Sequence, residues 1–155
     1  MGFYISVQEE FLDGPTVWYM RRTGPYGPEN AALMKSFKGW LQEQGLYGDD
    51  AVITAIALDD PRTTRPQDCR YDVCLLRVGS AAPLSGKLDI RRLDSGRYLT
   101  FLIEHTPEAI RRAWAECFTE PERHGFLPDL SRPVMERYAK RLVDRHLCEL
   151  CVPIL

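Results

Sequence analysis

The 155-residue sequence has no long apolar run, few cysteines and histidines, and no excess of charge of either sign. A membrane-spanning helix needs about 20 apolar residues, so neither such a helix nor a signal peptide is predicted, and we expect no membrane contact. Five cysteines, an odd number among apolar neighbours, are typical of reduced thiols and favour a cytoplasmic location. The net charge of −2, from 20 basic and 22 acidic residues, predicts no direct nucleic-acid binding. The basic pairs are interpreted as solvated faces on separate elements: Arg21-Arg22, Arg91-Arg92 and Arg111-Arg112.

Motifs of the common enzyme classes are also missing. The sequence has no G-x-S-x-G elbow, no P-loop, and no G-x-G-x-x-G after a predicted strand. The three histidines, His105, His124 and His146, lack metal-ligand spacing, so no metal and no cofactor are predicted. Glu104-His105 could form an acid–base pair, but adjacent residues of a strand face opposite ways. No catalytic residue is assigned, and enzymatic activity stays an open question.

One cysteine pair, Cys148 and Cys151, has the spacing of a metal or redox motif. It lies in the segment Leu147–Ile154, which has the composition of a strand, where residues three apart face opposite sides. No second such pair accompanies it, although His146 is adjacent. Two buried, unpaired thiols are the favoured interpretation.

What the sequence does contain is a degenerate internal repeat. The segment Val17–Leu46 has a strand-like run, a Gly-Pro turn and a helix with a Trp, and Gly96–Phe126 has the same order. We predict helices over Pro28–Gln44 and Pro107–Arg123, the first ended by Gly45. Their apolar stripes are Met34, Phe37 and Leu41 in the first helix, and Ile110, Trp114, Cys117 and Phe118 in the second.

Runs of apolar and alternating residues predict the strands around these helices. They are Phe3–Gln8, Pro15–Arg22, Ala51–Leu58, Tyr71–Val78, Leu88–Leu93, Tyr98–Ile103, Pro133–Lys140 and Leu147–Ile154. Asp94-Ser95-Gly96 predicts a hairpin turn between the fifth and sixth strands. The result is one α+β domain over residues 1–155, with halves of about 1–80 and 86–155 joined by a Gly79–Gly86 linker. Two duplicated strand–helix–strand–strand units predict a pseudo-symmetric sheet, antiparallel or mixed, with a ligand cleft where the halves meet.

Glu136 is the strongest candidate for a functional side chain. In the segment Pro133–Tyr138, strand alternation puts Val134, Glu136 and Tyr138 on one face. A partly buried acid beside aromatic residues suits a lipophilic cation, through charge attraction and cation–π contacts. The alternative is a solvated glutamate on an edge strand, paired with Arg137 or a neighbouring lysine. Other aromatic residues expected to wall the cleft are Phe101, Trp114 and Tyr26.

An ordered set of short motifs resembles the GyrI-like family. The set is Arg22-Thr23-Gly24-Pro25-Tyr26, Trp40-Leu41, Asp59-Asp60-Pro61, Cys69-Arg70-Tyr71-Asp72, Gly96-Arg97-Tyr98, Trp114, Pro133-Val134-Met135-Glu136-Arg137-Tyr138 and Cys151-Val152-Pro153-Ile154. That family includes the effector-binding domains of AraC-type and BmrR-type regulators and the stand-alone DNA gyrase inhibitor SbmC. The resemblance covers nearly the whole chain.

The resemblance implies duplicated β-α-β-β modules, with pseudo-two-fold symmetry, around a central cleft. In regulators of this type a glutamate in an F-E-x-Y-like strand meets lipophilic cationic drugs, and Glu136 occupies that position. Met135 replaces the aromatic residue often found before the acid, and His105-Thr106-Pro107 replaces the Gly-Pro-Tyr turn in the second half. Both departures affect the expected shape of the pocket.

Three functions are compatible with this resemblance. The first is a stand-alone module that senses or sequesters amphipathic, lipophilic cations. The second is inhibition of DNA gyrase through protein interaction. The third is hydrolysis of cyclopropane-bearing natural products, with the carboxylate of the pocket glutamate as general base. No segment of the sequence resembles a helix-turn-helix reader of DNA.

Overall fold

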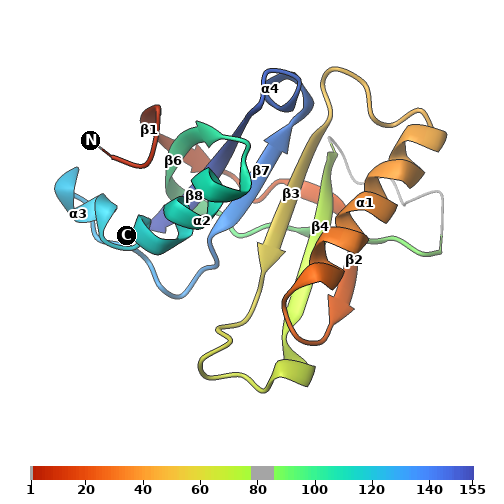
Figure 1. Cartoon of the computed structure of the whole chain (residues 1–155), viewed down its shortest axis with the longest axis horizontal. Helices are drawn as coiled ribbons and strands as arrows, with labels where there is room; N and C mark the ends of the chain where they lie inside the picture. The colour runs from red at the N-terminus through yellow and green to blue at the C-terminus, as the bar shows by residue number, and fades with distance from the viewer. Residues whose placement is uncertain (1, 78–85) are drawn as a thin grey trace.

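The computed structural model describes residues 2–77 and 86–155 and has the predicted α+β fold (Figure 1). Among these residues, eight strands form one antiparallel sheet. The strands are β1 (Ser6–Leu12), β2 (Thr16–Thr23), β3 (Val52–Ala57), β4 (Arg70–Arg77), β5 (Asp89–Arg92), β6 (Gly96–Glu104), β7 (Met135–Ala139) and β8 (Leu147–Ile154). The helices are α1 (Pro28–Glu43), α2 (Pro107–Glu116), α3 (Glu120–Arg123), α4 (Lys140–Val143) and the short 3-10 helix η1 (Pro66–Asp68). None of the described helices is long and apolar enough to cross a membrane.

The sheet is built from two repeats that meet at its centre. Its strand order is β1-β6-β8-β7-β3-β4-β2-β5, in which β2-α1-β3-β4 and β6-α2-β7-β8 are the two copies of one element order. The copies join through β3 and β7, which pair from Val52 opposite Ala139 to Ile56 opposite Met135. The predicted duplication of strand–helix–strand–strand units is therefore confirmed in the order of the elements.

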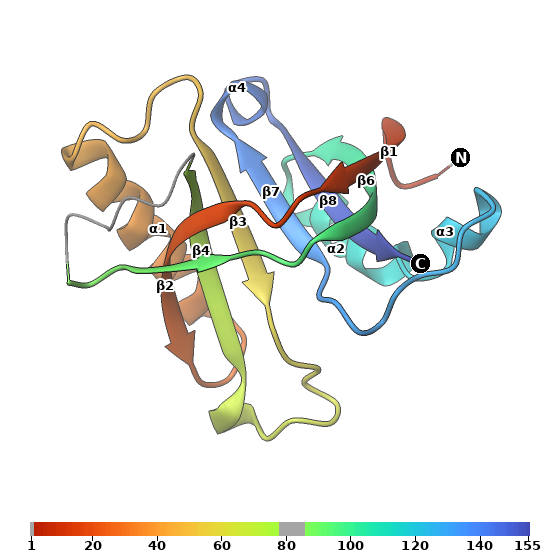
Figure 2. The same ribbon diagram turned by 180° about the vertical axis from the view of Figure 1, so that it is seen from behind.

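The first strand of each half pairs with the other half. Leu12 lies opposite Gly96, and Thr16 lies opposite Arg92. The pairing of β1 with β6 therefore continues into the pairing of β2 with β5 in the same antiparallel register. The Leu93 N–H donates to the Pro15 carbonyl oxygen between these two pairings. The segments β1–β2 and β5–β6 are thus two long, bent strands that form a ribbon, and Figure 2, seen from behind, shows both crossing in front of β3 and β4.

This ribbon overturns the predicted hairpin at Asp94-Ser95-Gly96. The strands β5 and β6 do not pair with each other, because each pairs with the long strand of the first half. The Ser95 hydroxyl donates to the Leu12 carbonyl oxygen across the bend of the ribbon. A Gly-containing polar tripeptide marks a change of chain direction, and here the change is a bend rather than a reversal.

The helix α1 covers the first half of the sheet. It ends one residue before the predicted limit, and Gly45 follows it with φ of +69°, a conformation that favours glycine. Its side chains Phe37 and Leu41 are fully buried, and Met34 packs against the same cluster. The predicted helix and its apolar stripe are confirmed.

The second predicted helix is two helices. Thr106 caps α2, accepting a 3.1 Å hydrogen bond from the Ala109 N–H, and α2 ends at Glu116 instead of continuing to Arg123. Pro121 explains the interruption, because proline has no N–H and its ring clashes with the carbonyl four residues earlier. Proline is tolerated in a first helical turn, which is its place in α3. Of the predicted stripe, Cys117 is buried, whereas Phe118 is exposed.

Three apolar clusters hold these layers together. One lies between α2 and the second half of the sheet, one lies under α1, and the third joins the ribbon to the opposite face of the sheet through residues such as Val17 and Tyr98. Cys148 belongs to the first cluster and Cys151 to the third, so the strand separates them onto opposite faces as predicted. All five cysteines are buried and unpaired.

The basic pairs are not simply solvated faces. Arg21 Nε lies 2.7 Å from Asp72 Oδ1, and Arg91 Nη2 lies 2.8 Å from Asp72 Oδ2. The Asp72 side chain is fully buried in β4, so the two arginines neutralise it from the neighbouring β2 and from β5, the next strand beyond β2. The pairs do lie on separate elements, as predicted, but the expectation of solvated faces was wrong for Arg21 and Arg91, because the ribbon brings both to Asp72.

Most predicted strand limits agree with the structure to within two residues. The exception is Phe3–Gln8, where β1 starts and ends later than predicted. The segment Pro133–Lys140 agrees within that margin with β7, and Lys140 begins α4. Val78 and most of the predicted linker, residues 79–85, lie outside the described residues.

Candidate functional site

A cavity of about 320 Å³ lies where the two halves meet on the helix-bearing face of the sheet. Its walls come from α1, the loop after α1, the central strands β3, β4 and β7, the end of β6, and α4. The lining residues are Gly27, Asn30, Ala31, Met34, Lys38, Tyr47, Ile53, Tyr71, His105, Glu136, Tyr138 and Val143. A cleft between the halves is what the repeat predicted.

Glu136 supplies a partly buried carboxylate to this cavity. Its Oε2 accepts a 2.7 Å hydrogen bond from the Trp114 indole N–H, and its Oε1 accepts a 3.2 Å bond from the Tyr138 hydroxyl. Burial raises the pKa of Glu136, and the two hydrogen bonds act in the opposite direction. Within residues 2–77 and 86–155, no cation is paired with this carboxylate.

The neighbouring Arg137 does not neutralise Glu136. It points to the opposite face of β7, where it makes 2.9 Å ion pairs with Glu149 and Glu10. The strand β7 is central, with β3 on one side and β8 on the other. The alternative of a solvated edge-strand glutamate paired with Arg137 is therefore excluded.

Tyr138 and Tyr71 present aromatic surface next to the carboxylate. Burial raises the pKa of both hydroxyls, and the charge of Glu136 adds to the shift in each case. Both tyrosines therefore stay neutral, and Tyr138 donates to Glu136. The ring of His105 packs against that of Tyr138, with 5.3 Å between centroids.

Trp114 positions the acid without lining the cavity. It lies on α2, and its indole joins that helix to β7 through Glu136 Oε2. Phe101, expected as a wall, is fully buried in the second-half core, where its ring centroid lies 5.0 Å from those of Phe3 and Tyr4. Strand alternation puts Phe101 on the correct face of β6, but there it packs in the apolar cluster beneath α2, away from the cavity.

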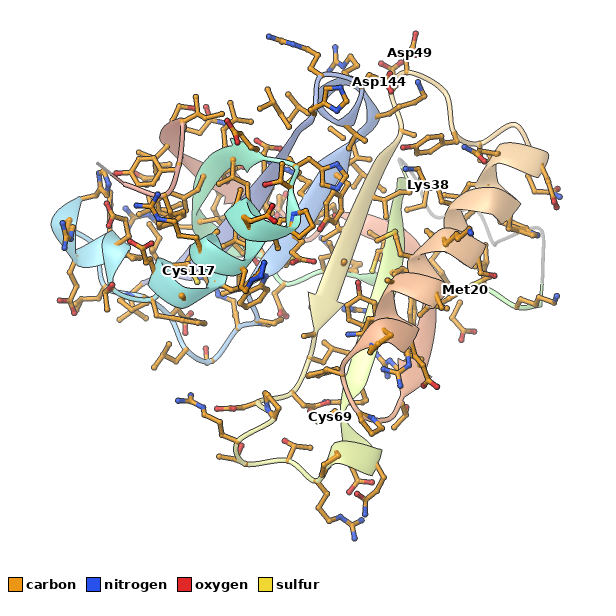
Figure 3. The ribbon with its side chains drawn as sticks, viewed as in Figure 1. Met20, Lys38, Asp49, Cys69, Cys117 and Asp144 are labelled. Carbon is orange, nitrogen blue, oxygen red and sulfur yellow. The ribbon has the colours of Figure 1, made fainter. Side chains whose placement is uncertain are left out.

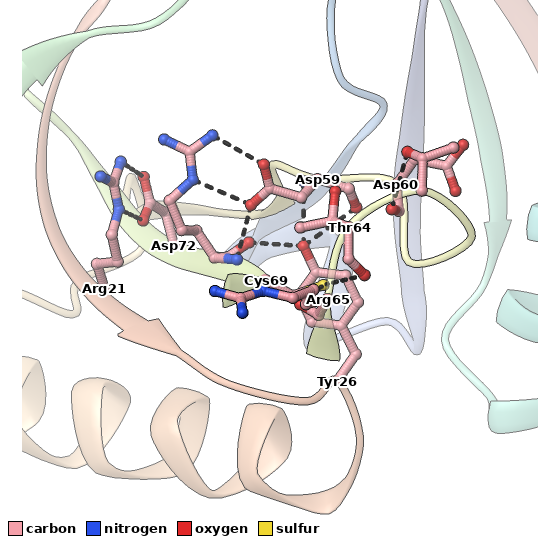
Figure 4. Close-up of polar contacts among 10 residues, drawn as sticks. Arg21, Tyr26, Asp59, Asp60, Thr64, Arg65, Cys69 and Asp72 are labelled. Atoms are coloured by element: carbon pink, nitrogen blue, oxygen red, sulfur yellow. Dashed lines mark hydrogen bonds and ion pairs between the residues drawn. The ribbon is translucent and has the colours of Figure 1, made fainter. Parts of the chain in front are cut away.

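Tyr26, the other expected wall, is a structural anchor. Its hydroxyl donates to the Arg70 carbonyl oxygen at 2.8 Å and accepts from the Asp59 N–H at 3.1 Å (Figure 4). These bonds fasten the turn before α1 to both ends of the loop between β3 and β4. Tyr26 is absent from the cavity lining, whereas its neighbour Gly27 is present.

Several lining residues were missed in the sequence. His105 was set aside as a strand residue facing away from Glu104, but β6 ends at Glu104, so alternation does not apply to His105. Burial and the charges of Lys38 and His146 lower the pKa of His105. Lys38 follows Ala31 and Met34 at helical spacing, and this spacing was the signal that could have identified it.

The site has no set of metal ligands. Among the described residues, no group of three or more His, Cys, Asp or Glu side chains is arranged to hold a metal ion. The cavity instead offers one carboxylate, neutral aromatic walls and a lysine. Such an arrangement can bind an organic cation, or can use the carboxylate as an acid or base.

Comparison with protein families gives one match over almost the whole chain. Residues 6–155 match the model of the GyrI-like small molecule binding domain. The chain belongs to this family. A GyrI-like relative, the SPbeta prophage-derived protein YosT of Bacillus subtilis (strain 168), is 38% identical over 151 residues, covering 97% of this chain and 98% of YosT. YosT carries a provisional name as a transcriptional regulator.

Solved structures share the GyrI-like fold at low sequence identity. The EcmrR C-terminal domain matches with a TM-score of 0.69 and 14% identity over 97% of both chains. In the EcmrR–DNA complex, this chain spans 57% of the EcmrR chain. SAV2435, solved with tetraphenylphosphonium bound, matches at 0.63 and 15% identity over 97% of this chain and 94% of SAV2435. A Listeria innocua hydrolase matches at 0.59 and 10% identity, over 97% and 92% of the two chains.

Proposed function

We propose that this GyrI-like chain binds amphipathic, lipophilic cations in the central cavity, with Glu136 as the anionic anchor. The observation that carries the proposal is a partly buried carboxylate whose described side-chain partners, Trp114 and Tyr138, are both neutral. Burying a charge without a counter-ion is unfavourable, so a cation that enters the cavity supplies the missing partner. The tetraphenylphosphonium bound to SAV2435 is a ligand of this class in a related fold.

Aromatic and apolar walls suit the lipophilic part of such a ligand. Tyr71 and Tyr138 flank Glu136, and Met34 and Ile53 add apolar surface. Cation–π contacts with the tyrosines contribute about 0.5–2 kcal/mol each in addition to apolar burial. In this proposal Trp114 is a positioning residue, while Phe101 and Tyr26 hold the framework around the cavity.

Titration with tetraphenylphosphonium tests the anchor directly. Glu136→Gln keeps the size of the side chain and removes its charge, and we expect the dissociation constant to rise at least tenfold. Loss of a charge that pairs with a desolvated cation costs about 2–5 kcal/mol. Glu104→Gln, an exposed glutamate at the end of β6, is the matched control and should bind as the wild type does.

Triphenylphosphine oxide provides the neutral counterpart of the probe. Its binding should be nearly the same in wild type and Glu136→Gln, because it carries no net charge for the carboxylate to attract. Equal binding of tetraphenylphosphonium by wild type and Glu136→Gln would contradict the proposed function.

We propose that ligand binding serves sensing or sequestration, in the manner of an effector module. YosT, similar over 98% of its own length, bears a regulator's name, which supports this role. The five buried, unpaired thiols support a cytoplasmic location for it. The nearly balanced charge supports the absence of direct nucleic-acid binding. A salt-dependent, sub-micromolar shift of random duplex DNA would contradict that absence.

Hydrolysis is the second candidate function. Glu136 has a pKa raised by burial, and Tyr138 and His105 face the same cavity, which is a set of groups able to transfer protons. The hydrolase from Listeria innocua shares the fold. If Glu136 acts as the base toward a cyclopropane-bearing electrophile, Glu136→Gln should lose turnover while ligand binding persists.

Gyrase inhibition is tested separately from cation binding and from hydrolysis. It requires a protein interaction and no cavity ligand, so a supercoiling assay with purified DNA gyrase, run without added ligand, distinguishes it. Ligand-independent inhibition that Glu136→Gln retains would favour the gyrase interaction over cation binding as the primary function.

A further inference from the structure

Lys38 brings a positive charge to the cavity that holds Glu136. It lies on α1 and lines the cavity together with Glu136 and Tyr138 of the strand β7. Its Nζ lies 5.2 Å from the centroid of the Tyr47 ring. In the part of the chain that the structure describes, no carboxylate forms an ion pair with Lys38.

The nearby Lys140 shows the opposite situation. Its Nζ lies 2.8 Å from Asp144 Oδ2 and 3.5 Å from Asp49 Oδ1, so two carboxylates neutralise it. It also lies 5.8 Å from the Tyr47 ring centroid. Figure 3 shows Asp49 and Asp144 at the α4 end of the molecule, with Lys38 on the α1 side below them. Of the two lysines beside Tyr47, Lys38 is the one whose charge a ligand can satisfy.

A surface groove continues the cavity at Lys38. This second hollow, of about 550 Å³, shares Lys38, Tyr47 and Val143 with the cavity. A ligand whose cationic part lies at Glu136 can therefore extend past Lys38 into the groove. The path leads from an interior with Glu136 and aromatic walls, past Lys38, to a groove in which Lys140 is already paired with Asp144.

From this arrangement we infer that the cavity selects zwitterionic ligands, in which a lipophilic cation is joined to a carboxylate or a comparable anion. The inference rests on the proposed function and adds a second ion pair between ligand and protein. Glu136 pairs with the cation of the ligand, and Lys38 pairs with its anion. A simple monocation pairs with Glu136 but is repelled by Lys38, whereas a zwitterionic ligand forms an ion pair with each of them. Lys38 is then a specificity-determining residue.

Matched phosphonium probes test the selection. A carboxybutyl-triphenylphosphonium carries both charges, its methyl ester carries the cation alone, and homologues with shorter and longer linkers cover the unknown span between the groups. Dissociation constants are measured by titration calorimetry for the wild type, Lys38→Met, Lys35→Met and Glu136→Gln. Lys35 is an exposed lysine of α1 outside the cavity lining, so Lys35→Met is the matched control.

We expect the wild type to prefer the carboxylate over the ester for at least one linker, by about fivefold, as for a partly exposed ion pair. Lys38→Met should abolish that preference, by weakening the carboxylate probe and strengthening the ester, and Lys35→Met should keep it. Glu136→Gln should weaken both probes. A preference unchanged by Lys38→Met would overturn the inference and leave the proposed function intact. Failure of every probe to bind, or binding insensitive to Glu136→Gln, would overturn both.

Discussion

The Trp114 indole N–H donates a 2.7 Å hydrogen bond to Glu136 Oε2 and thereby links the helix of the second half to the strand at the centre of the sheet. The donor is neutral, so it orients the carboxylate and stabilises its charge without cancelling it. The second oxygen, Oε1, accepts a hydrogen bond from the neutral Tyr138 hydroxyl. The carboxylate is thus held in place while its charge stays available to a ligand.

Removing the Trp114 donor should change the pH dependence of cation binding. In the proposed function the ionised form of Glu136 binds the cation, so affinity should rise with pH through the raised pKa of this residue. Trp114→Phe removes a bond that lowers this pKa, so the midpoint should move to higher pH. Tetraphenylphosphonium titrations over a pH series measure the midpoint, and Trp40→Phe, a tryptophan of α1 outside the cavity lining, controls for lost packing.

Other groups that face Glu136 bear on the same titration. Tyr71 and Tyr138 remain neutral because burial raises their pKa values, and Lys38 lines the same cavity. His105 has a lowered pKa, so it becomes cationic only at lower pH and then also opposes cation binding. His105→Gln separates the two contributions. A midpoint that moves with His105→Gln but not with Trp114→Phe would contradict the assignment to Glu136.

Glu136→Gln should stabilise the ligand-free protein at neutral pH. The folded-state pKa of this acid is raised, so its contribution to stability is complete below the unfolded pKa and is lost as pH rises through the folded pKa. The uncharged variant avoids that loss. We expect its Tm at pH 7 to exceed the wild-type value by roughly 2–4 °C, the shift that about 1 kcal/mol produces at this chain length.

The comparison of melting temperatures should also depend on pH. Well below the ordinary pKa of a glutamate, both side chains are neutral, and the difference in Tm between Glu136→Gln and the wild type should vanish. A variant that melts lower than the wild type at pH 7 would mean that the charge of Glu136 is already compensated inside the protein.

Asp72→Asn should destabilise the ribbon side of the fold. The Asp72 carboxylate is fully buried and pairs with Arg21 and Arg91, and the substitution leaves both arginines without it. Removing one partner of a buried pair costs several kcal/mol, and we expect about 3 kcal/mol here because both arginines are partly exposed. Urea unfolding measures this loss, and Asp60→Asn, at an exposed loop position, should leave the unfolding midpoint unchanged.

Two glycine substitutions should have opposite effects. Gly14, at the bend of the ribbon, has φ of +53°, and a Cβ there would lie 2.9 Å from Arg92 Nη2. Gly14→Ala should therefore lower the free energy of unfolding by about 1–3 kcal/mol. Gly39 lies inside α1 with open space around its Cα, so Gly39→Ala should raise the free energy of unfolding by about 0.5–1 kcal/mol. Equal effects in urea denaturation would contradict this account of the bend.

The local sequence pattern was sufficient to predict most of the secondary structure. The strand β8 follows its predicted limits, and α1 ends within one residue of its prediction, because alternation and helical spacing are properties of neighbouring residues. The break after Glu116 was also readable, since Pro121 lies inside the predicted helix. The ribbon could not be predicted, because the composition around Gly96 is the same whether the chain reverses or only bends.

The site was predictable in its centre and not in its surroundings. Strand alternation alone put Glu136 and Tyr138 on one face, and both line the cavity. Which aromatic residues join them depends on strand order and helix placement, and these are set by contacts between distant residues. Phe101 therefore proved to be core, while Tyr71, two strands away from β7 across β3, lies beside the acid.

The shared ribbon gives the duplicated chain the construction of a domain-swapped dimer whose subunits are covalently joined. Each half donates its first strand to the other, so neither half alone contains a complete set of strand partners. We expect the halves to unfold together in one cooperative transition, and each to aggregate when produced alone, because its unpaired edges are exposed. A cavity between the two halves then has walls that cannot drift apart without breaking the sheet, so ligand selectivity is coupled to the stability of the whole molecule.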